Sequence, residues 1–355
     1  MTLRVVAWST GNVGRHVIAG IDARPDLELV GLWVSSPAKV GRDAGELAGL
    51  GRHLGVPATN DAAALLALQP DCIVHSAIAD TRLMEALGDL QTFLRAGINV
   101  VSSGPVFLQY PDGVVPPSMS EPVREAAAAG GASIWVNGID PGFANDWLPL
   151  MVTSLSERIE QVRCMEICNY ATYNSPDIVF GVMGLGRSMD EVPMLLQPGV
   201  LSIAWGSVVR QLAAALDVEL DSVEEVYERL PAPEAFEIAA GPVEQGTVAG
   251  LRFEVQGMRA GRPVVVLEHV TRLRDDIGPD WPQPAGESCY RVVITGEPTY
   301  TVDLQLLGTD GDHNTAGLKA TAMRLVNAVP AVVAAQPGLL TAMDLPNITG
   351  RGLVV

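Results

Sequence analysis

A glycine-spaced turn near the N-terminus constrains the fold of this chain more than any other feature. Residues 9–14 read STGNVG and lie between the apolar run RVVAW and a segment with helical spacing, GRHVIAGIDARP. A dinucleotide site needs a tight first bend, close approach of the backbone to a pyrophosphate, and close packing of helix on strand. Gly11 and Gly14 meet the last two needs. Ser9 replaces the usual first glycine, and a small residue can make that bend if its backbone angles stay in allowed space.

The residues around this turn extend the same pattern over the first 150 positions. The runs RVVAW, LELVGLWV, DCIVHSA, NVVSS and ASIWVNG are short, apolar and bounded by turn residues, so we expect buried strands. Between them lie the helix-like segments GRHVIAGIDARP, DAAALLALQ, TRLMEALGDLQTFLRAG and SEPVREAAAAGG. This alternation predicts an α/β fold, a doubly wound parallel Rossmann sheet, for a dinucleotide-binding domain over residues 1–145. The alternative is a structural glycine turn in an ordinary α/β protein.

The remaining sequence predicts a second domain of a different kind. ERIEQVRCMEICNYATY is typical of a long strand, and SMDEVPMLLQPGVLSIAWGSVVRQLAAALDV contains a long apolar helix. Residues 236–275 alternate period-2 runs with glycine turns, and SCYRVVITGEPTYTVDLQLLG adds two strands. We expect an α+β substrate and dimerisation domain over residues 146–310, with an open mixed or antiparallel sheet. Residues 311–355 should form a helix and a tail that pack back on the first domain.

Charge and cysteine content exclude several functional classes. The chain of 355 residues carries a formal charge of -18, which opposes binding to nucleic acid or to an anionic membrane. We expect a cytoplasmic protein, because no leader or long membrane span is evident. Four cysteines are too few for a disulfide framework in a chain of this size. Cys164 and Cys168 share a face, but no second pair lies near them, so no metal site is expected.

The end of the second strand indicates which nicotinamide cofactor binds. An enzyme restricted to NAD usually ends this strand in an acid that bonds the ribose hydroxyl and repels a 2′-phosphate. Here the strand ends WVSSPAKVGRD, which offers hydroxyls and positive charge instead. This pattern favours NADP(H), with NAD(H) as an alternative and a merely solvated loop as another. The predicted pyrophosphate residues are Thr10, Gly11, Asn12, Val13 and Gly14, and the predicted 2′-phosphate residues are Ser35, Ser36, Lys39 and Arg42.

Further loops at the carboxyl ends of the strands should surround the nicotinamide. The predicted cofactor contacts in these loops are His75, Ser76, Ala77, Ser102, Gly104, Asp140, Pro141, Gly142 and Phe143. His75 is also a candidate proton donor. A lone histidine after an apolar run is more often a satisfied core residue, and that interpretation stays open.

Four segments together resemble one enzyme family. STGNVG, SSPAKVGRDAGEL, VNGIDPGF and AVPAVVAAQPGLLTAMDLPNITGRG are similar to segments of the 2,4-diaminopentanoate dehydrogenase and native amine dehydrogenase family, which has mycobacterial members. These are dihydrodipicolinate reductase-like, NAD(P)-dependent oxidoreductases. The resemblance covers nearly the whole chain. It implies a Rossmann domain, a dihydrodipicolinate reductase-like C-terminal domain, a homodimer, and hydride exchange with a carbon that bears nitrogen or oxygen.

One departure from the family concerns catalysis. Where family members carry a glutamate that binds ammonia or the substrate amine, NVVSSGPVFLQYP has Pro105 and Val106, which cannot transfer a proton. A carboxylate from elsewhere, Asp140, Asp146 or Glu166, could substitute for it. Alternatively, the enzyme reduces a preformed imine, a carbonyl or a conjugated alkene, with Tyr173 or Tyr170 as proton donor. The third alternative is a catalytically inactive nucleotide-binding or sensing protein.

We expect a small-molecule substrate between the nicotinamide and the strand CMEICNYATYNSPD. A mainly apolar site would favour a small hydrophobic ketone, aldehyde or imine. For each aromatic residue, a place in the core is an equally good interpretation. The expected substrate contacts are Val106, Phe107, Trp147, Asn169, Tyr170 and Tyr173.

Overall fold

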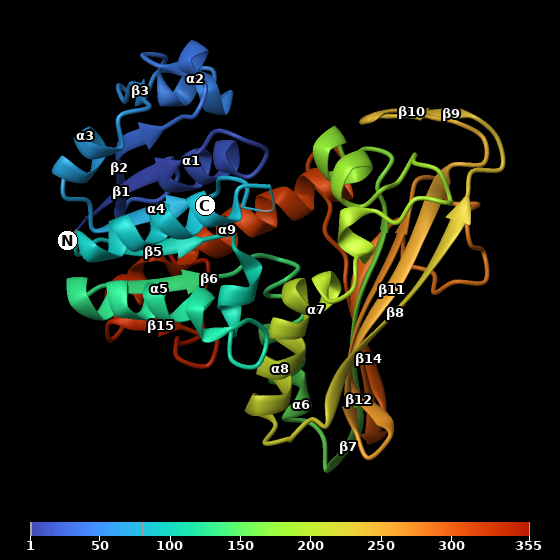
Figure 1. Ribbon diagram of the computed structural model, residues 1–355. Helices are drawn as coiled ribbons and strands as arrows, with labels where there is room; N and C mark the ends of the chain where they lie inside the picture. The colour runs from blue at the N-terminus through green and yellow to red at the C-terminus, as the bar shows by residue number, and fades with distance from the viewer. Residues whose placement is uncertain (1, 80, 355) are drawn as a thin grey trace. The chain divides into compact units, whose positions relative to one another are not determined.

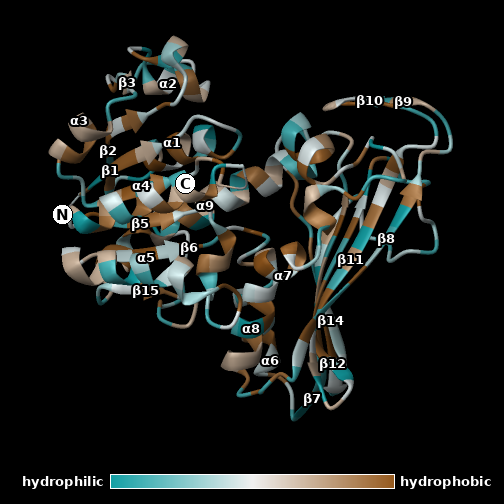
Figure 2. Cartoon of the chain, viewed as in Figure 1, coloured by the Kyte–Doolittle hydropathy of each residue, from teal (hydrophilic) through white to brown (hydrophobic). Residues whose placement is uncertain are grey.

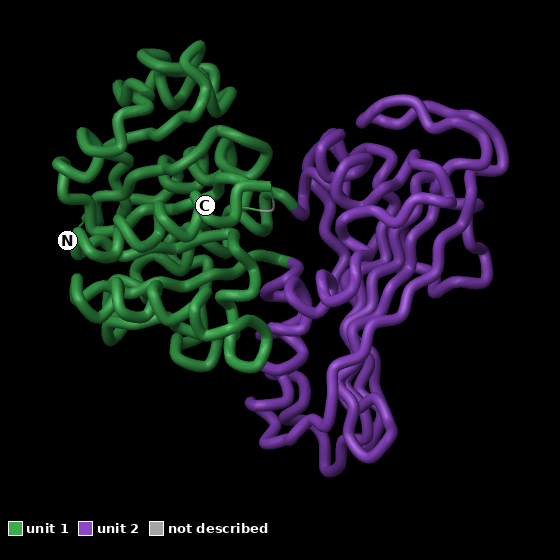
Figure 3. Tube along the Cα trace, viewed as in Figure 1, with its two compact units in different colours: residues 1–139, 318–355 green, residues 140–317 purple. Residues whose placement is uncertain are grey.

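The computed structural model describes residues 2–79 and 81–354 and divides the chain into two compact units (Figure 3). The first unit comprises Met1–Ile139 and Leu318–Val355, and the second comprises Asp140–Gly317. These limits differ from the expected domain boundaries at residues 140–145 and 311–317. The Asp140 side chain bonds Trp205, and the His313 side chain contacts Cys168, so both segments belong to the second unit.

The first unit contains a seven-stranded sheet in which every pairing is parallel (Figure 1). The strand order, β15-β6-β5-β4-β1-β2-β3, is that of a doubly wound Rossmann sheet. The fold class predicted for this half is therefore confirmed. The short strands β3 and β15 were not predicted. The strands are β1 (Leu3–Trp8), β2 (Leu27–Trp33), β3 (Ala58–Thr59), β4 (Cys72–His75), β5 (Asn99–Ser102), β6 (Ser133–Val136) and β15 (Gly338–Leu340).

Helices cover both faces of this sheet because its strands are apolar on both sides. Along β1, Val5 and Ala7 join one core cluster and Val6 and Trp8 join another. Figure 2 shows β1 and β2 largely in brown. The helical segments are α1 (Gly14–Asp22), η1 (Pro37–Lys39), α2 (Ala44–Ala48), α3 (Ala62–Ala67), α4 (Leu83–Arg95), η2 (Val106–Gln109) and α5 (Pro117–Gly130).

The long helix α9 (His313–Val333) belongs mostly to the first unit. Its residues Leu325 and Val329 share a core cluster with Val17 and Ile18 of α1. Residues 318–333 of the C-terminal helix therefore pack within the first unit, as expected. Within the described residues, no helix combines the length and apolar character that a membrane span requires.

The second unit contains a six-stranded mixed sheet in the order β14-β13-β7-β12-β11-β8. Strands β7 and β12 are parallel and the other neighbours are antiparallel. Strand β8 was not predicted, because its sequence, SVEEVYERLP, is rich in charge. Within the region expected to form a meander, β9 and β10 pair only with each other, as a hairpin separate from the six-stranded sheet. The strands are β7 (Arg158–Asn169), β8 (Ser222–Pro231), β9 (Phe236–Ile238), β10 (Gly241–Val243), β11 (Val248–Arg259), β12 (Arg262–Arg272), β13 (Cys289–Glu297) and β14 (Tyr300–Leu304).

Short helices cover one face of the mixed sheet. Leu201, Val209 and Leu212 pack there with inward-facing Leu251 and Leu267 in the main core of the unit. The predicted long helix is interrupted at Trp205, so it forms two helices. The helical segments are α6 (Trp147–Thr153), η3 (Asp177–Val182), η4 (Met194–Leu196), α7 (Val200–Ala204) and α8 (Gly206–Ala215).

Candidate functional site

The glycine turn after β1 closes tightly onto the start of α1. A Cβ atom on Gly14 would lie 2.3 Å from the carbonyl oxygen of Ser9, so only glycine fits there. Ser9 has a φ of 117°, and its Oγ accepts a hydrogen bond of 3.1 Å from the Gly11 amide. Ser9 therefore makes the bend with a positive φ, a conformation that residues other than glycine rarely adopt. Such a conformation costs about 1–3 kcal/mol, which the surrounding structure must supply.

The start of α1 has the features that a pyrophosphate requires. No side chain caps the helix at Val13, and the Gly14 position allows close approach of strand and helix. Lys39 Nζ donates a 2.9 Å hydrogen bond to Thr10 Oγ1, so this cation lies at the glycine turn. Arg42 instead pairs with Glu46 on α2, in an exposed ion pair of 2.7 Å. Ser35 is exposed, and Ser36 precedes η1.

His75, at the end of β4, is fully buried. The Ser102 hydroxyl donates to the Gly104 carbonyl at 2.5 Å, so it accepts the proton of His75 Nδ1 at 2.9 Å. Burial lowers the pKa of His75 to about 4, which keeps the ring neutral near pH 7. These contacts favour the structural interpretation of His75 over the catalytic one. Ser76 and Ala77 follow His75 and are partly exposed.

The loop after β5 offers no proton-transferring side chain at the family glutamate position. Pro105 is buried and precedes η2, and Val106 is the first residue of η2. Phe107 is 2% exposed and belongs to the core cluster of α4 and α5. The structure therefore places Phe107 in the core, although a substrate contact was expected.

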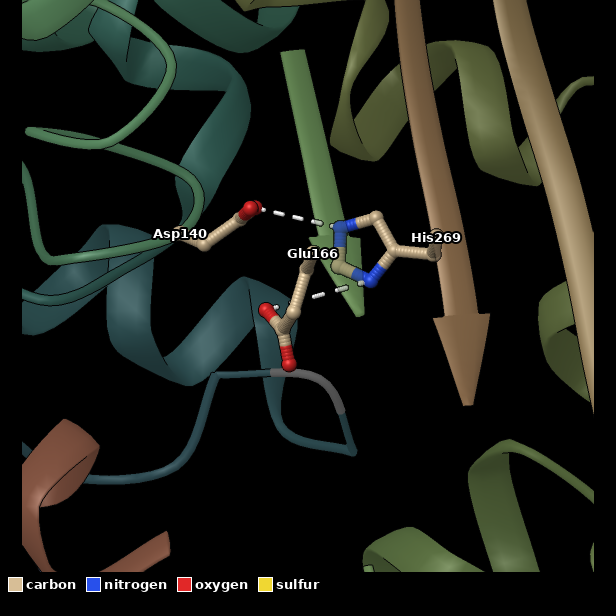
Figure 4. A group of neighbouring side chains, drawn as sticks. All are labelled: Asp140, Glu166 and His269. Atoms are coloured by element: carbon tan, nitrogen blue, oxygen red, sulfur yellow. Dashed lines mark hydrogen bonds and ion pairs between the residues drawn. The ribbon is translucent and has the colours of Figure 1, made fainter. Parts of the chain in front are cut away.

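A cluster of buried ionisable side chains lies in the second unit. Glu166 on β7 and His269 on β12 face each other directly in the parallel register. Asp140, which precedes α6, reaches the same imidazole ring (Figure 4). These three residues are named the acid–histidine cluster below. Their side chains are only 4–7% exposed, so their charges interact in a low-dielectric environment.

The two carboxylates approach different nitrogens of His269. The Nε2 atom lies 3.2 Å from Asp140 Oδ1, and the Nδ1 atom lies 3.9 Å from Glu166 Oε2. Trp205 Nε1 donates to Asp140 Oδ1 at 2.9 Å, and the Tyr170 hydroxyl donates to Glu166 Oε1 at 2.7 Å. Three of these contacts are hydrogen bonds, whereas 3.9 Å exceeds the range of a hydrogen bond.

Aromatic rings surround the imidazole. The Phe253 ring stacks on His269 at 4.7 Å between centroids, and the Trp205 ring meets it edge-on at 4.7 Å. Tyr170 packs against Tyr173, with ring centroids 5.1 Å apart. The cluster therefore combines ionisable groups with apolar walls, a combination typical of sites for small molecules.

The electrostatics of the cluster follow from this burial. Burial raises the pKa of Glu166, although His269 and the Tyr170 hydroxyl act in the opposite direction. For His269, burial opposes the charged form, but Asp140 and Glu166 outweigh it and the pKa is raised. The cluster therefore has groups that can exchange protons near neutral pH.

The same geometry limits what the cluster can do with a metal ion. Asp140, Glu166 and His269 bring ligand atoms within 4.8 Å of one another. However, the carboxylates approach different ring nitrogens (Figure 4), and Asp140 Oδ1 and His269 Nε2 are already bonded to each other, so a metal ion that used both atoms would displace that hydrogen bond. Hydrogen bonding and proton transfer are the chemistry that this arrangement supports directly.

Other predicted residues of the second unit have structural partners. Asn169 donates from Nδ2 to Asp275 Oδ1 at 2.7 Å, and its Oδ1 accepts from the Ala171 amide. Gly142 donates its amide to Asn145 Oδ1 within the turn that also contains Pro141 and Phe143. Trp147 begins α6. These contacts brace loops, and among the expected substrate residues Tyr170 hydrogen-bonds to Glu166 of the acid–histidine cluster.

Sequence reasoning did not identify His269 or Trp205. The signal for His269 was present in β12, where Val265, Leu267, His269 and Thr271 alternate on the core-facing side. A polar residue on an apolar face requires a partner. The identity of that partner was not accessible from the local pattern.

Comparisons with known proteins identify the family. The model of the 2,4-diaminopentanoate dehydrogenase C-terminal domain matches residues 143–351, and that of the dihydrodipicolinate reductase N-terminus matches residues 4–102. An amine dehydrogenase of Streptomyces virginiae is 42% identical, over 97% of this chain and 96% of that one. The 2,4-diaminopentanoate dehydrogenase of Acetoanaerobium sticklandii is 21% identical, over 97% of this chain and 93% of that one.

A solved structure shows that the whole fold is also shared with an amine dehydrogenase. The amine dehydrogenase from Mycobacterium smegmatis superposes with a TM-score of 0.80 at 23% identity, covering 99% of this chain and 98% of that one. Both sheets described above are thus found together in a known architecture. The chain belongs to the family of amine dehydrogenases and 2,4-diaminopentanoate dehydrogenases and is an NAD(P)-dependent oxidoreductase.

Proposed function

We propose that this enzyme interconverts an amine and a C=N or C=O carbon of a small, mainly hydrophobic substrate. In the amine-forming direction, a ketone or aldehyde, ammonium and reduced cofactor give an amine, oxidised cofactor and water. The nicotinamide supplies the hydride in this direction and accepts it in the reverse direction. The protein must bind the nitrogen compound, exclude water and transfer protons.

The acid–histidine cluster is the observation that carries this proposal. Reductive amination needs a group that accepts a proton from ammonium and later returns one to the departing oxygen. Pro105 and Val106 cannot do so. Glu166, with the Tyr170 hydroxyl at 2.7 Å and His269 at 3.9 Å, has the required chemistry in a buried site. Asp140 holds the far side of the ring.

The proposed cofactor is NADP(H), with NAD(H) as the alternative. Lys39 at the glycine turn supports this choice, because a 2′-phosphate is recognised by charge-assisted hydrogen bonds. Gly11, Asn12, Val13 and Gly14 would hold the pyrophosphate, and Ser35, Ser36, Lys39 and Arg42 would hold the 2′-phosphate.

A second candidate function is reduction of a preformed imine or a carbonyl without ammonia. The absence of an ionisable side chain at Pro105 and Val106 favours it. In that case the Tyr170 hydroxyl, or Tyr173 beside it, would donate the proton.

A substrate panel separates these functions. Purified enzyme is mixed with NADPH and small hydrophobic ketones, with and without ammonium chloride, and with a preformed cyclic imine. We expect cofactor oxidation with the ketones only when ammonium is present, and amine as the product by mass spectrometry. Ketone reduction to alcohol without ammonium would replace the amine dehydrogenase proposal with carbonyl reduction. Turnover of the cyclic imine alone would replace it with imine reduction, and no turnover would contradict both.

We also propose that two copies associate through the open face of the mixed sheet. This face carries Arg163, Arg252, Glu254 and Glu268, in ion pairs that include 2.9 Å for Arg163–Glu254 and 2.8 Å for Arg252–Glu268. Glu268 is almost fully buried, and the core helices α7 and α8 pack on the other face. A self-complementary face with balanced charge supports a two-fold dimer.

A further inference from the structure

We propose that the acid–histidine cluster is a binding site for an ammonium ion or a protonated primary amine, and that this cation takes the place of the second imidazole proton of His269. The inference rests on the proposed function and deepens it, because it identifies the ligand of the cluster and a proton exchange. Three lines of structural observation support it.

The first observation is the charge balance of the buried groups. Two carboxylates face one imidazole, and their side chains are at most 7% exposed. A protonated His269 therefore neutralises only one of two ionised carboxylates. A buried charge requires a counter-charge, because its desolvation is costly. A small cation would complete the balance, and it would compete with the proton that His269 otherwise carries.

The second observation is the arrangement of hydrogen-bond acceptors. Asp140 accepts from both Trp205 Nε1 and His269 Nε2, so the imidazole presents its Nδ1 atom to Glu166. Without a proton, Nδ1 is an acceptor. Nδ1 and Glu166 Oε2 are 3.9 Å apart, too far for a direct hydrogen bond but suitable for two acceptors of one multi-donor cation. Ammonium has four N–H donors and can satisfy both.

The third observation is a buried hydroxyl beside the cluster. Thr271 follows His269 by two residues on β12, so its side chain lies on the same face of the sheet. It is fully buried, and its Oγ1 atom has no hydrogen-bond partner among the described residues. Such groups are rare in folded proteins unless a ligand or water completes them. Thr271 is thus a third acceptor on the cluster face.

The neighbouring groups determine how binding depends on pH. His269 faces Asp140 and Glu166, and Glu166 also faces Tyr170, Cys168 and, from the adjacent strand β13, Tyr290. Burial raises the pKa of the Cys168 thiol and of both tyrosines well above their usual values, so these groups stay neutral. His313, whose Nε2 lies 3.1 Å from Cys168 Sγ, has its pKa lowered by burial.

These neighbours leave His269 and Glu166 as the groups that exchange protons. Below the raised pKa of His269, cation binding must displace a proton. The apparent affinity for ammonium therefore rises with pH until His269 is neutral in the free enzyme, and then becomes constant.

In the proposed reaction, the bound ammonium supplies the nitrogen. Glu166 accepts a proton from ammonium, and the resulting ammonia forms a C–N bond with the carbonyl carbon. A proton moves from the nitrogen to the former carbonyl oxygen, which gives the neutral carbinolamine. The proton on Glu166 then joins that oxygen, which leaves as water when the C–O bond breaks. The iminium product carries the positive charge that ammonium brought, so atoms and charge balance before hydride transfer.

Calorimetry of the intact enzyme tests the binding directly. Ammonium chloride is titrated at constant ionic strength in buffers that differ in ionisation enthalpy, with potassium chloride as the comparison ion. We expect release of up to about one proton per ammonium below the pKa of His269, and none above it. Potassium should bind at least about tenfold more weakly, because it donates no hydrogen bonds. Binding without proton release, or equal binding of potassium, would overturn the proposal.

Variants separate this site from the function as a whole. Glu166→Gln should weaken ammonium binding at least about tenfold and raise the KM for ammonium similarly. His269→Asn should remove the proton release and flatten the pH dependence. Glu160→Gln makes the same change on an exposed residue of β7 and should leave every value unchanged.

The outcomes remain distinguishable if a variant folds poorly. Thr271→Val is nearly isosteric and should weaken ammonium binding by about three- to tenfold with an unchanged melting temperature. Normal ammonium binding in the Glu166→Gln and Thr271→Val proteins, together with amine dehydrogenase activity in wild type, would overturn this site but keep the proposed function. Linked ammonium binding without turnover of any amine or ketone would overturn the function alone.

Discussion

His75 shows how one buried residue couples stability to pH. Its pKa is lowered to about 4 in the folded state, against an ordinary value of 6.5, because burial disfavours the charged ring. The unfolded chain therefore binds a proton at a higher pH than the folded chain. The contribution of this residue to the free energy of unfolding is fully present above about pH 6.5. It is lost as pH falls toward 4, by up to about 3 kcal/mol.

Replacing His75 tests this linkage. His75→Asn keeps a donor near Ser102 but cannot titrate, so its free energy of unfolding should fall less across this pH window than that of wild type. Urea unfolding at several pH values measures the difference. The matched control is His53→Asn, because the side chain of His53 is 81% exposed. Parallel pH profiles for wild type and His75→Asn would refute the linkage.

At the scale of a single element, the loop after β2 carries the two cations that we propose bind the 2′-phosphate of NADP(H). Lys39 lies on η1 and bonds Thr10, whereas Arg42 precedes α2 and is paired with Glu46. The two cations are therefore unequal. Lys39 faces the glycine turn, and the charge of Arg42 is partly compensated by a neighbour on its own loop.

This inequality predicts different effects of three substitutions. Lys39→Ala should weaken NADPH binding by about 1.5–3 kcal/mol and spare NADH, because it removes a charge-assisted phosphate contact. Arg42→Ala should have a smaller effect. Glu46→Gln should strengthen NADPH binding, because it frees Arg42 and removes a negative charge. Fluorescence titration of both cofactors measures all three, and equal losses for NADPH and NADH in Lys39→Ala would contradict this role of Lys39.

Strand and helix limits show where local sequence was sufficient. Strands β1, β2, β4, β5 and β6 and the longer helices of the first unit were predicted from apolar runs and glycine or proline boundaries. Strand β7 and helix α9 were predicted in the same way. Strand β8 was missed because it is an edge strand, with Val226 and Tyr227 each 47% exposed, so it lacks an apolar pattern. The predicted helix is divided at Trp205, whose side chain donates a hydrogen bond to Asp140.

At the scale of the whole molecule, the open face of the mixed sheet predicts the oligomeric state. Val226 lies on this face, because it pairs in register with Glu254 of the ion-pair network. Sedimentation equilibrium should give twice the chain mass of 37.5 kDa for wild type. Val226→Glu should shift the protein toward monomer, because it places a charge in the interface. Met84→Glu changes a 73% exposed residue of the first unit and should not. A monomeric wild type would disprove the dimer.

The amino-acid pattern alone specified the doubly wound sheet and the glycine turn, and it indicated an open second sheet without deciding between mixed and antiparallel pairing. These features depend on spacing along short segments, since a strand or helix is recognisable from neighbouring residues. Pattern and resemblance together also indicated that a family glutamate is missing and nominated Asp140, Asp146 and Glu166 as substitutes. The nomination named carboxylates but could not say which of them lie together or what lies between them.

Only the tertiary structure brought His269 between those carboxylates and placed Trp205 and Tyr170 on them. Asp140, Glu166 and His269 come from a loop and two strands far apart in sequence, and the parallel register of β7 with β12 pairs Glu166 with His269. Burial, which gives the cluster its altered pKa values, arises from packing of the whole unit. A chain's local pattern does not encode such distances, because they depend on contacts that form only when the sheet is complete.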